Sequence, residues 1–158
     1  MSESRPQRSD FSDGPHALGA VTLLARLLQD VLTPRLAELG LSFAEAVAMV
    51  RLWQSPDGSL SQSELIERLA VSRASGSLVL SDLEKGGFVT RSIDPADARR
   101  QIVELTARGS EIEGPVHAEF EAMEAHLFDP IGSDAWKTTY GSLRSAIETL
   151  IAERNAHD

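Results

Sequence analysis

The chain lacks cysteine and has no long hydrophobic run. Without cysteine, disulfide bonds, thiolate metal sites and thiol-based redox sensing are excluded. No apolar run approaches the roughly 20 residues that span a bilayer. The polar N-terminal stretch also lacks the apolar core that a signal peptide needs. We therefore expect a cytoplasmic protein with no membrane partner.

Positive charge is scarce as well, because the 158-residue chain has a formal net charge of −9. Such a value is unusual for a protein that binds nucleic acid. The acidic side chains are unevenly distributed along the chain. Residues 60–109 hold seven acidic and seven basic side chains, whereas residues 110–158 hold ten acidic and three basic ones. Contact with a phosphate depends on the field within a Debye length of about 8 Å. The neutral segment 60–109 therefore remains compatible with modest, salt-sensitive binding to a polyanion.

Signatures of catalysis are also missing. The chain has no phosphate-binding loop, no nucleophile elbow and no G-x-G-x-x-G. His117 is spaced along one predicted helix with Glu113, Glu121 and Glu124, but without the spacing of a known metal motif. We expect no catalytic residue, no metal site and no cofactor, and hence a protein that is not an enzyme.

The N-terminal third is predicted to be a disordered tail followed by two helices. Residues 1–13 are rich in Ser, Asp, Arg and Pro and have little to bury. Apolar residues at helical spacing predict a long helix over 15–39, bent at Pro34 and ended by Gly40. Ser42 is the predicted N-cap of a helix over 43–54.

Residues 61–109 predict a helix-turn-helix followed by a hairpin. A capping box of Ser61 and Glu64 opens a short helix that ends at Leu69, and Ser72 caps a second helix over 73–85. A strand over 88–93, a turn over 94–97 and a strand over 100–105 follow. The expected fold class is mainly α with a small β-hairpin wing, and this order of elements is typical of proteins that bind duplex DNA.

Two more helices are expected after the hairpin. The first covers 106–128, with a kink at Gly114-Pro115, and the second covers 133–154. The second has a coiled-coil-like seam of apolar residues spaced alternately by four and three: Trp136, Tyr140, Leu143, Ile147 and Leu150. Together with the first helix, these stripes exceed what one small domain can cover, which favours a homodimer.

Winding the helix over 73–85 at 100° per residue separates an inward from an outward face. The inward face holds Gly76, Val79, Leu80 and Leu83. The residues expected to contact base edges or phosphates are Ser72, Arg73, Ala74, Ser75, Ser77 and Leu78. Leu78 either contacts a thymine methyl or is covered by another part of the chain. Gly76 either permits close helix packing or leaves the reading head poorly ordered until DNA binds. A merely solvated, serine-rich surface is the ordinary alternative for the outward face.

The hairpin supplies the remaining predicted DNA contacts. Arg99 can enter a narrow minor groove, where the electrostatic potential is most negative, and Asp97 can orient it by ion pairing. Arg91 and Arg100 complete the set. An ordinary charged hairpin is the alternative.

These residues resemble the MarR family of winged-helix transcriptional regulators. The motifs that carry the resemblance are Gly40-Leu41-Ser42, Val71-Ser72-Arg73, Leu83-Glu84-Lys85, Gly87-Phe88-Val89, Asp94-Pro95-Ala96-Asp97-Ala98-Arg99 and Leu105-Thr106-Ala107-Arg108-Gly109. The resemblance implies one protomer over 14–158, with a winged helix-turn-helix reading head (residues 41–109) and dimerisation helices over 14–40 and 110–155. It also implies a homodimeric repressor of a pseudo-palindromic operator, with Arg99 as the minor-groove finger.

Many members of this family are released from DNA by small aromatic or anionic effectors. Groups expected near such an effector are His16, Arg51 and Trp53, although a Trp in this position is more often part of the core and an Arg more often part of the surface. The net charge and the apolar Leu78 leave a different function open, a winged-helix dimer that binds a protein partner. A ligand-binding protein without DNA function is a third alternative.

Overall fold

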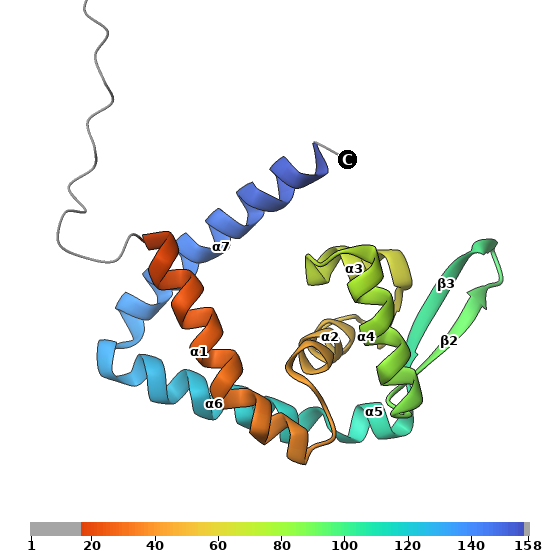
Figure 1. Cartoon of the computed structure of the whole chain (residues 1–158), viewed down its shortest axis with the longest axis horizontal. Coiled ribbons are helices and arrows are strands. Elements are labelled where there is room, and N and C mark those ends of the chain that lie inside the picture. The colour runs from red at the N-terminus through yellow and green to blue at the C-terminus, as the bar shows by residue number, and fades with distance from the viewer. Residues whose placement is uncertain (1–16, 157–158) are drawn as a thin grey trace, which may run out of the picture.

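A computed structural model describes residues 17–156, and Figure 1 shows how its elements are arranged. Helices α1 (Ala17–Glu38), α6 (Glu113–Phe128) and α7 (Ser133–Asn155) occupy one side of the molecule, and the wing projects from the other. The wing is formed by β2 (Val89–Asp94) and β3 (Asp97–Leu105). The remaining elements are α2 (Phe43–Trp53), β1 (Ser59–Ser61), α3 (Gln62–Leu69), α4 (Arg73–Lys85), α5 (Ala107–Glu111) and the short 3-10 helix η1 (Asp129–Ile131). The predicted fold class, mainly α with a small β-hairpin wing, is confirmed. The predicted tail over 1–13 lies outside the described residues.

Serine caps define where the helices of the reading head begin. Ser42 forms a full capping box with Glu45: the Glu45 N–H donates to the Ser42 hydroxyl at 3.3 Å, and the Ser42 N–H donates to the Glu45 carboxylate at 2.6 Å. The capping box predicted at Ser61 is only half formed. The Glu64 N–H donates to the Ser61 hydroxyl, but the Glu64 carboxylate pairs instead with Arg68 at 2.6 Å.

The core lies where α2, α3, α4, the sheet and α6 meet. Its fully buried side chains come from all of these elements and from the end of α1: Leu36, Leu41, Met49, Leu52, Leu65, Leu80, Leu83, Phe88, Val89, Val103 and Val116. The inward face predicted for α4 is confirmed, because Gly76, Leu80 and Leu83 are buried and Val79 is half-buried. This packing fixes which face of α4 remains outside.

Gly76 allows α3 and α4 to approach closely. A Cβ atom at this position would lie 2.6 Å from Cγ1 of Ile66, which is closer than real Cβ contacts. Of the two interpretations considered for Gly76, the structure favours close helix packing.

The wing sheet has three strands in the order β1-β3-β2, all antiparallel. Strand β1 was not predicted, because three residues next to a turn leave too little alternation to detect. The return strand was predicted to begin at Arg100 but begins at Asp97, since Asp94 pairs with Asp97 across the turn. Only Pro95 and Ala96 therefore form the tip.

The predicted helix over 106–128 is two helices, α5 and α6, separated at Ile112. The expected kink at Gly114-Pro115 was therefore placed slightly too late. Pro115 has no N–H to donate to the Glu111 carbonyl, and its ring clashes with a continuing helix. In the first turn of α6 the missing N–H costs no hydrogen bond, because N–H groups there have no partner within the helix. The helix also begins only two residues before Pro115, so no preceding turn is present for the ring to clash with.

Candidate nucleic-acid interface

The outward face of α4 carries the residues predicted to contact DNA. Ser72 is the N-cap, and its hydroxyl accepts from the Ser75 N–H at 3.1 Å. Ser72, Arg73, Ala74 and Ser75 are exposed and Ser77 is half-buried. Leu78 is 62% exposed in the middle of this face. The helix thus presents an uncovered, mixed polar and apolar surface at its N-terminal half.

Arg99 extends from the wing into solvent and is oriented by Asp97. Its side chain is 92% exposed, and its Nε lies 3.4 Å from Oδ1 of Asp97. The same carboxylate oxygen accepts from the Arg99 backbone N–H at 3.0 Å. The predicted pairing of Asp97 with Arg99 is therefore present, although Arg99 lies on β3 just after the tip.

The other two arginines of the hairpin differ in how firmly the protein holds them. Arg100 remains exposed and forms a loose ion pair with Asp94, at 3.8 Å. Arg91 donates two hydrogen bonds to the Glu84 carboxylate, and its side chain is only 24% exposed. Arg91 therefore attaches the wing to α4, and its contact with DNA remains a prediction.

The Glu84–Arg91 pair makes the attachment of the wing sensitive to acid. Hydrogen bonds from the Arg91 guanidinium lower the pKa of Glu84 from its ordinary value of 4.5. A lowered folded-state pKa contributes stability above the unfolded-state value, and this stability is lost as the pH falls through the folded-state pKa. Glu84→Gln should therefore lower the urea midpoint near pH 7, and the difference from wild type should shrink as the pH falls below 4.5 and through the lowered folded-state pKa.

Glu111→Gln removes the same charge from an exposed position on α5 and serves as the control. A difference between Glu84→Gln and wild type that is unchanged in acid would contradict the role assigned to the pair.

Three arginines surround one hollow between the wing and the helix-turn-helix. Arg73 enters it from α4, and Arg99 and Arg100 enter it from β3. Its volume is about 510 Å³, and its other lining residues are Gln62, Ser63, Ile66, Ile93, Ala98 and Gln101. The sequence analysis did not single out Gln62, Ser63 or Gln101. Gln62 and Ser63 begin the first helix of the helix-turn-helix, which is a reasonable place to expect polar contacts. Cations around a concave surface of this kind favour an anionic strand.

Of the residues expected near an effector, Arg51 and Trp53 lie in different surroundings. Arg51 lines a hollow of about 340 Å³ between α2 and α6, together with Val47, Val50, His117, Phe120, Glu121 and Glu124. Trp53 does not line it; its indole N–H donates to the Gly109 carbonyl at 3.0 Å, and its ring packs edge-on against His117. Trp53 is thus part of the packing between α2 and α5. His16 lies outside the described residues.

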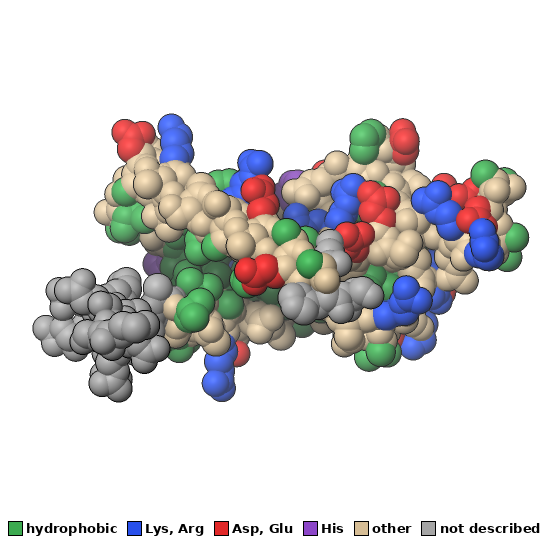
Figure 2. Space-filling view, turned by 90° about the horizontal axis from the view of Figure 1, so that it is seen from above, with side chains coloured by type: hydrophobic (Ala, Val, Ile, Leu, Met, Phe, Trp, Pro, Cys, Tyr) green, Lys and Arg blue, Asp and Glu red, His purple; other side chains and the backbone are tan. Residues whose placement is uncertain are grey.

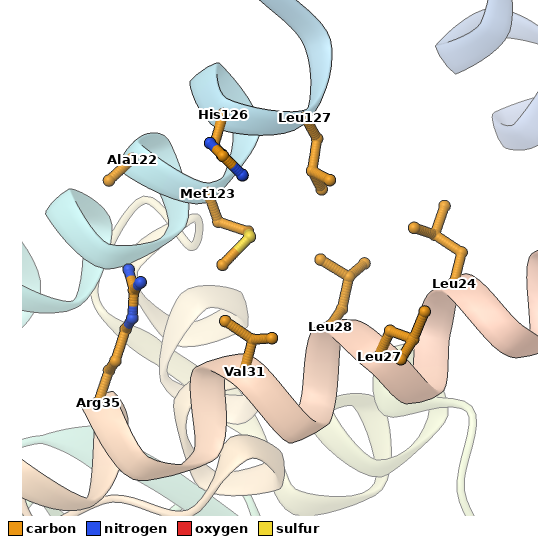
Figure 3. Close-up of a pocket in the computed structure, with 9 residues that line it drawn as sticks. All are labelled: Leu24, Leu27, Leu28, Val31, Arg35, Ala122, Met123, His126 and Leu127. Atoms are coloured by element: carbon orange, nitrogen blue, oxygen red, sulfur yellow. The ribbon is translucent and has the colours of Figure 1, made fainter.

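An apolar groove separates α1 from α6 on the side away from the wing. Figure 3 shows Leu24, Leu27, Leu28 and Val31 of α1 facing Met123 and Leu127 of α6. Figure 2 shows hydrophobic side chains gathered in the half of the molecule opposite the wing. Several large hydrophobic residues of α1 and α7 are exposed as well, including Leu18, Leu23, Tyr140, Ile147 and Leu150. The apolar stripes of these helices are therefore only partly covered within one protomer.

Two negative observations concern residues 17–156. No three His, Asp or Glu side chains in this part of the chain are grouped closely enough to hold a metal ion. None of the helices described has the length and apolar character needed to cross a bilayer.

Known proteins resemble this chain in both sequence and structure. The sequence model of the MarR family matches residues 41–100. An HTH-type transcriptional regulator of Bacillus subtilis (strain 168), YwaE, is 30% identical over 125 residues, which are 79% of this chain and 72% of that protein. Sco3205, a MarR family transcriptional regulator from Streptomyces coelicolor crystallised in complex with DNA, gives a TM-score of 0.73 at 27% identity, covering 87% of this chain and 92% of Sco3205. A crystal structure of MarR gives a TM-score of 0.74 at 27% identity, covering 87% and 99% of the two chains.

Proposed function

Because the chain belongs to the MarR family of transcriptional regulators, we propose that it is a homodimeric repressor of a pseudo-palindromic operator. The observation that supports this function best is the grouping of Arg73, Arg99 and Arg100 around one hollow beside the exposed face of α4. The similar protein Sco3205 was crystallised with DNA. The protein would act in the cytoplasm, where bacterial-type regulators meet their promoters.

In this proposal α4 enters the major groove and the wing reaches the adjacent minor groove. The face formed by Ser72, Arg73, Ala74, Ser75, Ser77 and Leu78 would contact base edges and phosphates. Arg99 would enter the minor groove, oriented by Asp97. Arg100 would contact a phosphate, and Arg91 would hold the wing against α4.

The proposed dimer would bury the exposed apolar surface of the terminal helices. Large hydrophobic side chains such as Leu27 and Val31 on α1, and Ile147 and Leu150 on α7, are exposed in the protomer. Contiguous apolar surface of this kind typically marks a protein–protein interface. A dimer would place its two α4 helices in successive major grooves, about 34 Å apart. Sedimentation equilibrium tests this arrangement, and a stable monomer would contradict it.

A small aromatic or anionic effector would bind in the hollow between α2 and α6. One observation favours this site: Nε of Arg51 is buried there without a hydrogen-bond partner among the described residues, beside apolar Val47, Val50 and Phe120. An aromatic carboxylate that releases DNA from the wild type but not from Arg51→Ala would support the proposal. Equal release from both proteins would contradict the site.

Salt dependence of DNA binding tests the main proposal. Each phosphate neutralised on duplex DNA lowers the slope of log K against log salt by about 0.9. If most of the arginines around the two hollows of a dimer contact phosphates, gel shifts on the promoter beside the gene should give a slope of about −3 to −5. Failure to bind any duplex, even at low salt, would refute the DNA-binding proposal. It would favour the alternative that the winged-helix dimer binds a protein partner.

A further inference from the structure

Leu78 is a large hydrophobic residue whose exposure the protomer does not explain. The other two leucines of α4, Leu80 and Leu83, are fully buried, whereas Leu78 is 62% exposed. It lies on the same outward face as Ala74, four residues earlier, so the two form a short apolar strip among polar residues. Nothing in the packing of the reading head requires leucine at this position.

The position of Leu78 separates it from the apolar groove between α1 and α6. Helix α4 lies in the half of the molecule that carries the wing and α1 lies in the other half (Figure 1), whereas the end of α7 reaches α3, where Arg154 donates to the Glu67 carbonyl at 3.5 Å. The arginines beside the α4 face, Arg73 and Arg99, are both exposed. Arginines on both sides of a small apolar strip are complementary to a partner that presents an apolar group between negatively charged groups.

We propose that Leu78 reads the C5-methyl group of a thymine in the major groove, and that it thereby sets the sequence preference of each half-site. This inference rests on the proposed function, since it requires α4 to enter the major groove. The thymine methyl is the one apolar group on the major-groove edges of the four base pairs. Leucine can neither donate nor accept a hydrogen bond. Against the N7 and N6 atoms of adenine, or the N4 amino group of cytosine, it would therefore desolvate polar groups without replacing their hydrogen bonds.

The size of the effect follows from the area of one methyl group. Burying a methylene-sized group corresponds to about fourfold in an equilibrium constant. A dimer with two equivalent half-sites should therefore lose about sixteenfold in affinity when both methyl groups are removed. Effects of this size are readily measured by titration.

Methyl deletion in the DNA provides a direct test. A binding site is first selected from randomised duplexes with the full chain, and each thymine is then replaced symmetrically by deoxyuridine, which removes only the C5-methyl group. At one thymine of each half-site, the replacement should weaken wild-type binding by about sixteenfold. The Leu78→Ala protein should bind the thymine and deoxyuridine duplexes equally. Its own melting temperature should match the wild type, because the side chain is exposed.

Ile131→Ala is the matched control. Ile131 is 51% exposed, but it lies in the short connection between α6 and α7, outside the reading head, and has no access to a thymine methyl in this proposal. This variant should retain the full preference for thymine over deoxyuridine.

The inference and the proposed function fail in different ways. Sequence-specific binding that is indifferent to every deoxyuridine, or a thymine preference retained by Leu78→Ala, would overturn the inference and leave the function standing. Absence of duplex binding by the wild type would overturn both. A Leu78→Ala protein that binds DNA normally but loses association with a protein would show that Leu78 belongs to a partner surface instead.

Discussion

An Arg99→Ala protein is expected to bind its operator about a hundredfold more weakly than the wild type. Hydrogen bonds to a charged group are worth about 1.5 kcal/mol or more, which corresponds to roughly tenfold for each wing. Two wings act in the proposed dimer, so the two losses multiply. The Arg99 side chain is 92% exposed and packs on nothing that its removal would disturb. Fluorescence anisotropy with a labelled operator, at constant salt, measures the loss.

Two further variants separate the wing contact from a general charge effect. Lys137→Ala removes one positive charge from an exposed position on α7, far along the chain from the wing, and should change affinity little. Arg99→Lys keeps the charge but loses the planar guanidinium, and it should recover only part of the affinity. If Arg99→Ala binds within twofold of the wild type, the wing does not enter the minor groove as proposed.

Gly109→Ala should destabilise the protein by about 3 kcal/mol, a large share of the stability of a typical domain. An added Cβ would lie 2.1 Å from the Phe88 carbonyl oxygen and 3.3 Å from Cδ2 of Leu105. The Phe88 carbonyl has little freedom to move, because it accepts hydrogen bonds from the Thr106 N–H at 3.0 Å and from the Thr106 hydroxyl at 3.1 Å. On its other side Gly109 accepts the hydrogen bond from Trp53. Urea unfolding at a fixed protein concentration measures the change.

Gly114→Ala provides the matched control for this substitution. Gly114 lies in the first turn of α6 and a Cβ there would meet nothing within 4 Å. Alanine has the higher helix propensity, by up to about 1 kcal/mol, so this variant should be neutral or slightly more stable. Equal urea midpoints for Gly109→Ala and Gly114→Ala would show that α5 can shift away from Phe88 without loss of stability.

Local signals were sufficient to predict most of the helices. The serine N-caps at Ser42, Ser61 and Ser72 all accept the expected backbone hydrogen bond. The inward face of α4 followed from helical periodicity, because its buried residues recur at helical spacing within one element. The ion pair of Asp97 and Arg99 was also predictable, since two residues on one short strand need no tertiary information.

Features that depend on distant parts of the chain were not predictable. Strand β1 exists because Leu60 pairs with Val103, more than forty positions away in sequence. The ion pair of Arg91 on β2 with Glu84 on α4 joins two elements and has no local signal in the sequence. The role of Trp53 likewise depends on Gly109, which no local pattern connects to it. In each case the decisive partner comes from another element.

The central position of β3 has a mechanical consequence. Strand β3 carries Arg99, pairs with β2 on one edge and pairs on the other with β1, which leads directly into α3. The wing therefore has no free hinge at its base, and a displacement of α3 is transmitted to β3 through the pairing of β1 with Ile102, Val103 and Glu104. The wing and the helices of the reading head should therefore rotate together as one rigid body. A signal that weakens operator binding would then have to rotate the two reading heads of the proposed dimer relative to each other, because neither wing can move independently of its own reading head.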